Sequence, residues 1–268
     1  MSLSAHDISF NYAPRFALRV DRLAAEAGEL VGIIGPNGSG KTTLMKILAG
    51  LLPSSGGDVL LDGLPIGSYP PHRRARHLTY VPQHHRPAFE FTVEQTVLLG
   101  RIPYRGAYGG FERDEDIGAA EDALARMELL ELRHEPITAL SGGELQRVMI
   151  AKALAQEAPT LLLDEPNSHL DIAHQQSVLG TIRGQVRRRG LCVVASVHDL
   201  NLASIFCDRV IAMAAGRVIA QGTPREVLTA GLLRQTFGAD MVVEPNVYGD
   251  APAVRYRYDD GAGGGDAG

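Results

Sequence analysis

Gly35-Pro36-Asn37-Gly38-Ser39-Gly40-Lys41-Thr42-Thr43 is the stretch that decides the fold of this 268-residue chain. An apolar run, Leu30–Ile34, precedes it and predicts a buried strand, and a helical pattern begins at Thr42. In this context the pattern G-x-x-x-x-G-K-[ST] binds phosphate, because glycines let backbone N–H groups surround the oxygens and the helix N-terminus adds positive charge. The motif predicts that Lys41 reaches the β- and γ-phosphates of a nucleotide and that the Thr42 hydroxyl binds Mg²⁺.

The composition is that of an ordinary globular protein, with 45% hydrophobic and 21% charged residues. A net charge of -5 and a pI near 6 argue against nucleic acid as the main partner. The two cysteines, Cys192 and Cys207, are expected to be buried apolar positions in a reducing compartment. We see no secretory signal, and no run approaches the ~18 apolar residues that span a bilayer, so a membrane process would need another chain to do the spanning.

The first part of the chain predicts short strands and helices around the phosphate loop. Strands are expected at Asp7–Tyr12, Ala17–Leu23, Val59–Leu61 and Leu78–Val81, and a helix at Thr42–Leu51 that stops at Pro53-Ser54-Ser55-Gly56-Gly57. A basic helix with Arg73, Arg74 and Arg76 precedes the last of these strands, and its arginines are most simply a solvated face.

The region from about 86 to 158 changes character and predicts an α-helical insertion, with helices at Thr92–Leu99, Asp114–Met127 and 142–157. Beyond it, strands at Thr160–Leu163, Leu191–Val197 and Arg209–Met213 alternate with helices at 171–188 and 199–206. This alternation predicts an α/β fold with a largely parallel sheet and helices on both faces. Two short helices and a strand-like segment follow, and the tail, 259–268, is expected to be disordered. We therefore predict one domain over 1–240 and a C-terminal extension over 241–268.

Two adjacent acids, Asp164 and Glu165, end the apolar strand that begins at Thr160. Neighbouring strand positions point to opposite sides, so the two carboxylates cannot share one role. A carboxylate that ends a buried strand next to a phosphate loop suits Mg²⁺, which favours Asp164 as the metal residue and Glu165 as the general base. The alternative, a solvated turn after a core strand, weakens once the phosphate loop is present.

A second glycine-rich segment, Leu140–Gln146, opens the helix at 142–157. Ser141 with Glu144 three residues later forms a capping box, which explains these two residues by helix stability alone. The doubled glycine, Gly142-Gly143, is not needed for capping, and would let backbone N–H groups approach a second anion.

Tyr12 has two interpretations. The first is one more core aromatic on the face of Ile8 and Phe10, and spacing alone favours it. The second is a platform on which a purine ring stacks.

In order and spacing these motifs resemble those of ATP-binding cassette (ABC) transporter ATPase subunits, over nearly the whole chain to about residue 240. The resemblance implies a P-loop NTPase (RecA-like) core with an antiparallel β subdomain and an α-helical ABC insertion. It also implies roles for individual residues: Tyr12 as the adenine-stacking aromatic, Gly35 to Thr43 as Walker A, Gln83 as the Q-loop glutamine, Ser141, Gly142, Gly143 and Gln146 within the signature motif, Asp164 and Glu165 as the Walker B end, Asn167 to Asp171 as the D-loop, and His198 as the switch histidine. One departure is Asn167, where Thr is more usual.

In this family two subunits pack head to tail, so that each ATP lies between Walker A of one copy and the signature motif of the other. The resemblance thus implies a homodimer that binds ATP and Mg²⁺, with Ser141 and Gly143 on the partner's γ-phosphate. Lys41, Gln83, Glu165 and His198 are the expected catalytic group, and Thr42, Gln83 and Asp164 the expected metal residues.

Shorter segments, such as Leu99-Gly100-Arg101-Ile102-Pro103-Tyr104 and Leu170–Gln175, resemble importers of iron-siderophore, haem or cobalamin. That resemblance implies polytopic permease subunits, a substrate-binding protein that acts indirectly, and a peripheral location on the cytoplasmic face of the inner membrane. Two alternatives stay open: a non-transport single-cassette ATPase of the iron–sulfur assembly type, and an importer of a simple metal ion or oxyanion.

Overall fold

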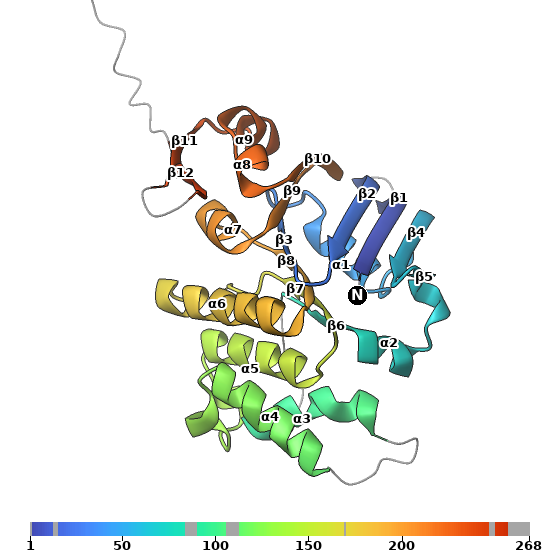
Figure 1. Cartoon of the computed structure of the whole chain (residues 1–268), viewed down its shortest axis with the longest axis vertical. Helices are drawn as coiled ribbons and strands as arrows, with labels where there is room; N and C mark the ends of the chain where they lie inside the picture. Colours follow the sequence, from blue (N-terminus) through green and yellow to red (C-terminus); the bar gives the residue numbers. More distant parts are fainter. Residues whose placement is uncertain are drawn as a thin grey trace, which may run out of the picture.

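The computed structural model of the chain describes residues 2–12, 16–83, 90–105, 113–168, 170–246 and 250–256. Within these ranges ten strands form one continuous sheet in the order β5-β4-β1-β2-β10-β9-β3-β8-β7-β6 (Figure 1). The strands are β1 (Ser2–Tyr12), β2 (Phe16–Glu26), β3 (Leu30–Ile34), β4 (Gly56–Leu61), β5 (Leu64–Pro65), β6 (Leu78–Val81), β7 (Thr160–Asp164), β8 (Cys192–Ser196), β9 (Arg209–Ala214) and β10 (Arg217–Gly222).

The sheet has a parallel part and an antiparallel part. Strands β6, β7, β8, β3 and β9 are parallel neighbours, and every residue of β3, β7 and β8 is buried, as expected for strands covered on both faces. Strands β1, β2, β4 and β5 form the antiparallel part. The two parts meet at β10, which pairs with β9 on one side and bridges to β2 on the other. The predicted α/β fold is confirmed, but β10 was not expected from the sequence.

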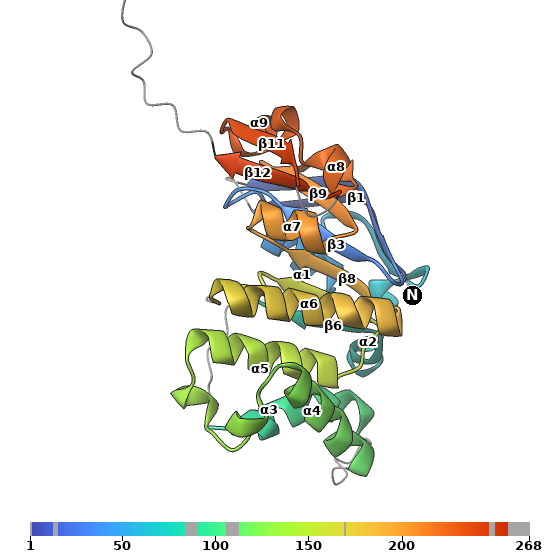
Figure 2. The same cartoon turned by 60° about the vertical axis from the view of Figure 1, so that its left-hand side comes forward.

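Helices cover both faces of the sheet (Figures 1 and 2). Successive residues of β7 point to opposite faces, so Leu161 and Leu163 join one buried cluster and Leu162 joins the other. The apolar side of α1 lies in the cluster of Leu162, and those of α5, α6 and α7 lie in the cluster of Leu161. The helices are α1 (Lys41–Leu48), α2 (Pro71–His77), α3 (Val93–Leu98), α4 (Asp114–Arg126), α5 (Gly142–Ala155), α6 (Ile172–Arg189), α7 (Leu200–Phe206), α8 (Pro224–Val227) and α9 (Ala230–Phe237).

Helices α3, α4 and α5 pack on one another at one end of the molecule, within the stretch predicted as an insertion (Figure 1). A 3₁₀ segment, η2 (Leu99–Tyr104), follows α3 and contacts both α2 and α5.

The strand-like segment near the C-terminus is a hairpin of two strands, β11 (Met241–Pro245) and β12 (Pro252–Tyr256). It packs on α7, where the Ser204 hydroxyl donates to the Pro252 carbonyl at 2.6 Å. The predicted disordered tail, 259–268, lies outside the described residues.

The structure corrects four details of the sequence prediction. The helix predicted to reach Leu51 ends at Leu48, and Gly56-Gly57, expected to stop a helix, begin β4. Two of the three arginines predicted as a solvated face have hydrogen-bond partners, because Arg74 donates to the Gly50 carbonyl at 3.2 Å and Arg76 to the Pro103 carbonyl at 2.7 Å, whereas Arg73 is exposed as predicted. Tyr12 is not a core residue, since 51% of its surface is exposed. Both cysteines are buried, as expected.

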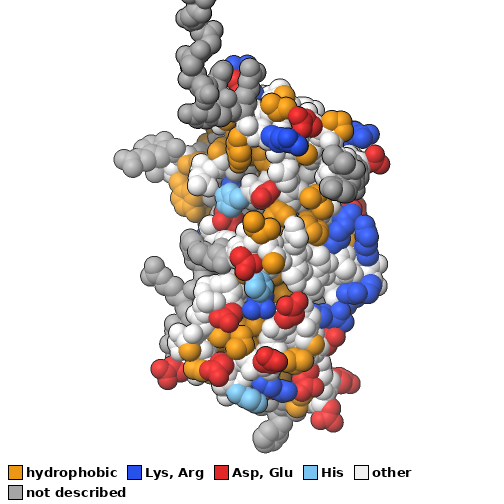
Figure 3. All heavy atoms as spheres, turned by 90° about the vertical axis from the view of Figure 1, so that its left-hand side faces the viewer, with side chains coloured by type: hydrophobic (Ala, Val, Ile, Leu, Met, Phe, Trp, Pro, Cys, Tyr) orange, Lys and Arg blue, Asp and Glu red, His pale blue; other side chains and the backbone are white. Residues whose placement is uncertain are grey.

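No helix in the described part of the chain combines the length and apolar character needed to cross a bilayer. On the face shown in Figure 3, acidic, basic and apolar side chains are intermixed, with a group of basic side chains along one edge.

Candidate functional site

The phosphate loop connects β3 to α1 in a conformation that requires glycine. Gly35 has φ 154°, and a Cβ atom on it would lie 2.2 Å from the Met213 carbonyl oxygen, so no larger residue fits there. Gly40 is the N-cap of α1, with φ 102° and no side chain that could cap the helix. The first-turn N–H groups of α1 therefore have no side-chain partner at the cap and are available to an anion.

Lys41 folds back over this loop. Its Nζ donates to the Gly35 carbonyl at 2.8 Å and lies 3.2 Å from the Pro36 carbonyl. The side chain is 5% exposed. Burial lowers the pKa of Lys41, an effect that the carboxylates of Glu165 and Asp164 oppose. The cation is thus held at the loop with two acids nearby.

Asp164 ends β7 and is fully buried. Its Oδ1 accepts from the Ser196 hydroxyl at 2.7 Å, and its Oδ2 accepts from the Tyr80 hydroxyl at 3.3 Å. Burial and then the nearby carboxylate raise the pKa of Tyr80 far above its ordinary value, so its hydroxyl stays a neutral donor. The two hydrogen bonds fix the direction of the Asp164 carboxylate.

Glu165 is the first residue after β7, and its carboxylate has other partners than that of Asp164. Its backbone has φ 54°, and its N–H donates to Ser196 Oγ at 2.8 Å. Its carboxylate accepts from Gln83 Nε2 on one oxygen and contacts His198 Nε2 with the other. Gln83 follows β6 and His198 follows β8, so three adjacent parallel strands deliver these side chains to the same edge of the sheet.

An open cleft of about 440 Å³ lies over the loop. It is lined by nine of the predicted site residues and by Phe16: Tyr12, Asn37, Gly38, Gly40, Lys41, Thr42, Thr43, Gln83 and Glu165. Tyr12 stands in its wall, with the ring centroid of Phe10 at 4.7 Å and that of Phe16 at 6.5 Å. An exposed aromatic platform at one end and a phosphate loop at the other suit a nucleotide.

Ser39 supports this fit. Its Oγ is buried at the loop and has no hydrogen-bond partner among the described residues. A buried hydroxyl without a partner is costly, and an anion in the loop would satisfy it. Next to the loop, the Thr42 hydroxyl and the Asp164 carboxylate supply the hard oxygen atoms that Mg²⁺ prefers.

The signature residues do not line this cleft. Ser141 is the exposed N-cap of α5, and its N–H and hydroxyl donate to Glu144 Oε2 at 2.8 and 2.7 Å. These hydrogen bonds lower the pKa of Glu144. Gly142 is exposed beside it, and Gly143 is partly exposed.

Two further predicted residues also lie apart from the cleft. Gln146 is buried, and its Nε2 is 3.5 Å from the Glu165 carbonyl oxygen. Asp171 is the exposed N-cap of α6 and accepts from the His174 N–H at 2.8 Å.

Sequence reasoning missed Ser196 and Tyr80 as supports of the acid pair, and Phe16 as a wall of the cleft. Ser196 did leave a signal, because it is a polar residue at the end of an apolar, fully buried strand. Tyr80 left none that distinguishes it from other strand aromatics.

A sequence profile described as ABC transporter matches residues 18–168. The chain is 42% identical over 216 residues to the cobalamin import ATP-binding protein BtuD of Halobacterium salinarum, covering 81% of this chain but only 54% of that protein. It is 41% identical over 260 residues to the hemin import ATP-binding protein HmuV of Pseudomonas fluorescens, covering 95% of this chain and 100% of that one.

Solved structures are similar too. One described as an inward-facing conformation of a proposed metal-chelate type ABC transporter has a TM-score of 0.81 at 27% identity, covering 94% and 95% of the two chains. A dimeric bacterial ABC transporter cassette has a TM-score of 0.74 at 27% identity, covering 82% and 98%.

Proposed function

The chain belongs to the ABC transporter family, and from this premise we propose that it is the ATP-hydrolysing subunit of a membrane importer. One observation carries the proposal: the carboxylate of Glu165 is held between Gln83 and His198 in the wall of the cleft that contains Lys41. A carboxylate fixed by two polar groups beside a phosphate loop is suited to orient a water molecule toward a phosphate.

In this proposal the protein mainly positions groups and neutralises charge, because phosphoryl transfer passes through a loose transition state. Tyr12 stacks on the adenine ring, while the loop N–H groups hold the phosphate oxygens. Glu165 accepts a proton from the attacking water. Lys41 and His198 stabilise the negative charge on the γ-phosphate oxygens.

Thr42 and Asp164 are the residues proposed to hold Mg²⁺, with Gln83 at the same edge of the sheet. When bound, the ion would neutralise charge on the phosphate oxygens. The hydrogen bonds from Ser196 and Tyr80 hold the Asp164 carboxylate in place for this role.

The site is proposed to be completed by a second copy of the chain, packed head to tail. Ser141, Gly142, Gly143 and Asp171 are separate from the cleft of their own chain, and Ser141 stands exposed at the N-terminus of α5. Backbone N–H groups at a helix N-terminus bind anions, so these residues suit the partner's γ-phosphate. The dimeric cassette among the similar structures supports the formation of a dimer. Gln146 is proposed to act within its own chain, through the Glu165 carbonyl.

A permease is proposed to dock in a second cleft, of about 390 Å³, between α1, α2, β6 and α5. Leu51, 58% exposed, lines it, and so does Pro82, which directly precedes Gln83. A partner seated there would contact both the core and the helical insertion, and would be mechanically linked to Glu165 through Gln83. The chain would then lie peripherally on the cytoplasmic face of the cell membrane.

The proposed cargo is haem, cobalamin or an iron-siderophore, delivered by a substrate-binding protein. Support comes from the names of the relatives, which are cobalamin and hemin import proteins. The chain spans about half the length of the cobalamin relative, so the hemin relative, matched over its whole length, carries more of this argument.

The test is the Glu165→Gln variant, with the exposed Glu131→Gln as its matched control. We expect Glu165→Gln to bind ATP with near-parental affinity, to form a stable ATP-dependent dimer and to lose most ATP turnover, while Glu131→Gln behaves like the parent. Turnover near the parental rate in Glu165→Gln would contradict the proposal.

The cargo is tested by purifying the full chain with its polytopic membrane partner and measuring ATPase activity with haem, cobalamin and ferric siderophore. Stimulation by none of the three would overturn the proposed cargo class.

A further inference from the structure

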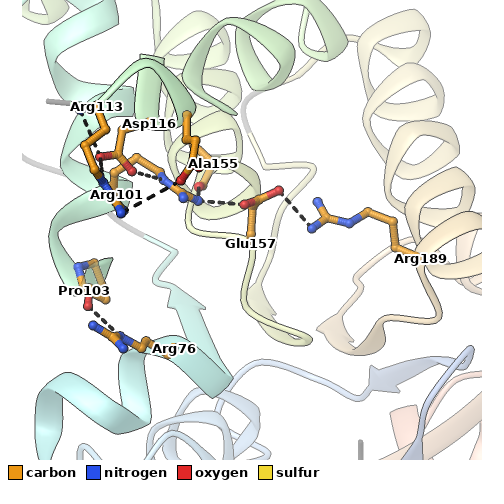
Figure 4. Close-up of polar contacts among 9 residues, drawn as sticks. Arg76, Arg101, Pro103, Arg113, Asp116, Ala155, Glu157 and Arg189 are labelled. Atoms are coloured by element: carbon orange, nitrogen blue, oxygen red, sulfur yellow. Dashed lines mark hydrogen bonds and ion pairs between the residues drawn. The ribbon is translucent and has the colours of Figure 1, made fainter. Parts of the chain in front are cut away.

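Arg101 is a buried cation at the junction between the helical insertion and the core. It lies in η2, and only 5% of its surface is exposed. Its Nε donates to Asp116 Oδ1 at 3.0 Å, and its Nη1 donates to the Ala155 carbonyl and to Glu157 Oε2, both at 2.8 Å (Figure 4). A buried charge is costly unless it is paired and hydrogen-bonded, and the planar guanidinium is met here by three acceptors.

These acceptors belong to different elements. Asp116 is on α4 and is fully buried, with further hydrogen bonds from Arg113. Ala155 is the last residue of α5, so Arg101 satisfies a terminal carbonyl and complements the dipole of that helix. Glu157 also pairs with Arg189, the last residue of α6, at 3.1 Å. The ends of α5 and α6 are therefore tied together through the guanidinium of Arg101 and the carboxylate of Glu157.

The same segment is held from the side of α2. The Arg76 Nε donates to the Pro103 carbonyl at 2.7 Å (Figure 4). The Tyr104 ring lies 4.2 Å from the Arg101 guanidinium carbon. The other end of α5 differs, because Ser141 is exposed and its side chain bonds within its own capping box. Helix α5 is thus tied to α4 and α6 at its C-terminal end, while its first residues, Ser141 and Gly142, are exposed.

We propose that Arg101 is a positioning residue for the signature end of α5: by fixing Ala155 against α4 and α6, it sets where Ser141 and Gly143 stand for the nucleotide of a second copy. This inference rests on the proposed head-to-tail function. An α-helix of 14 residues is about 21 Å long, so a tilt of about 5° at the fixed end moves the far end by about 2 Å. A shift of that size breaks a hydrogen bond to phosphate.

Arg101 does not line the nucleotide cleft of its own chain. Its loss should therefore leave ATP binding to a single copy intact and weaken closure of two copies. If Arg101 only stabilised the fold, its loss would lower the thermal stability and would not affect ATP binding and dimerisation differently.

The experiment uses the full chain carrying Glu165→Gln, with and without Arg101→Lys. Lysine keeps the charge but cannot reach Asp116, Ala155 and Glu157 together. The matched control is Arg133→Lys, whose partners Glu94 and Glu121 lie within the insertion. A fluorescent ATP analogue at low protein concentration measures single-copy affinity, and sedimentation velocity with ATP measures dimerisation, both well below the melting temperature.

We expect Arg101→Lys to keep ATP affinity within about twofold and to weaken ATP-dependent dimerisation at least tenfold, with no change for Arg133→Lys. The inference would be overturned if the protein with Arg101→Lys dimerised as well as the protein with Glu165→Gln alone. It would also be overturned if Arg133→Lys weakened dimerisation to the same extent. If Arg101→Lys does not fold, the variant Arg189→Ala, at an exposed residue, replaces it. ATP-dependent dimerisation weakened at least threefold supports the inference, and unchanged dimerisation overturns it. Failure of Glu165→Gln itself to dimerise with ATP would instead overturn the proposed function, and this inference with it.

Discussion

His198 contacts the Glu165 carboxylate through its Nε2 atom, although the two residues follow different strands, β8 and β7. The parallel pairing of these strands brings both side chains to one edge of the sheet. The carboxylate proposed to act on water and the imidazole proposed to stabilise the phosphate charge are thus fixed relative to each other.

The first prediction concerns His198. We expect His198→Ala to lower the ATP turnover of the dimer by about 10²- to 10³-fold, the usual loss when one donor to transition-state charge is removed. Steady-state phosphate release measures it, and the ATP dissociation constant should change little. The control is His134→Ala, an exposed histidine of the insertion. Equal turnover in both variants would contradict the role of His198.

Tyr12 supplies the second prediction. Stacking on a base contributes about 1–3 kcal/mol, so Tyr12→Ala should raise the dissociation constant for ATP by about 5- to 150-fold. Tyr12→Phe keeps the ring and should bind nearly as the parent does. Equilibrium fluorescence titration measures both. Tyr256→Ala, at an 86% exposed tyrosine of the hairpin, is the control. Unchanged binding in Tyr12→Ala would show that the ring does not stack.

The third prediction compares two glycines. Gly35→Ala places a methyl group 2.2 Å from the Met213 carbonyl oxygen, so the loop must move and ATP affinity should fall at least tenfold. Gly118 is exposed inside α4, and an added Cβ meets nothing within 4 Å. Gly118→Ala should therefore raise the free energy of unfolding by about 0.5–1 kcal/mol without changing ATP affinity. Parental affinity in Gly35→Ala would mean that the loop tolerates a side chain.

The fourth prediction concerns acid stability and Asp116. Burial raises the pKa of Asp116, but hydrogen bonds from Arg101 and Arg113 outweigh burial and hold it below its ordinary value of 3.8. Because the folded-state pKa is the lower one, ionised Asp116 stabilises the fold above 3.8, and this contribution is lost as the pH falls through the lowered pKa.

Asp116→Asn should therefore reduce the free energy of unfolding at neutral pH and flatten its dependence on pH between about 5 and 2. Urea titrations across that range measure the effect. Asp122→Asn, on the exposed side of the same helix, should leave the curve close to the parental one. A curve for Asp116→Asn as steep as the parent's would contradict the assignment.

The sequence by itself determined the strand–loop–helix context of the phosphate loop, the position of Asp164 and Glu165 at the end of a buried strand, and the capping box at Ser141. Each of these depends on rules that act over a few residues: the glycine spacing of a loop, the alternation of a strand and the first turn of a helix. The apolar runs also predicted the parallel sheet, because strands buried on both faces leave a continuous apolar signal.

Only the tertiary structure decided which distant side chains support these motifs. Ser196 and Tyr80 reach Asp164 because β8 and β6 are the two neighbours of β7, and no local pattern specifies strand order. Tyr12 faces the cleft instead of the core because β1 extends past the buried cluster that holds Ile8 and Phe10. Arg101 meets Glu157 and Ala155 through the packing of η2 on α5, a contact set by the burial of both segments and not by their separation in sequence.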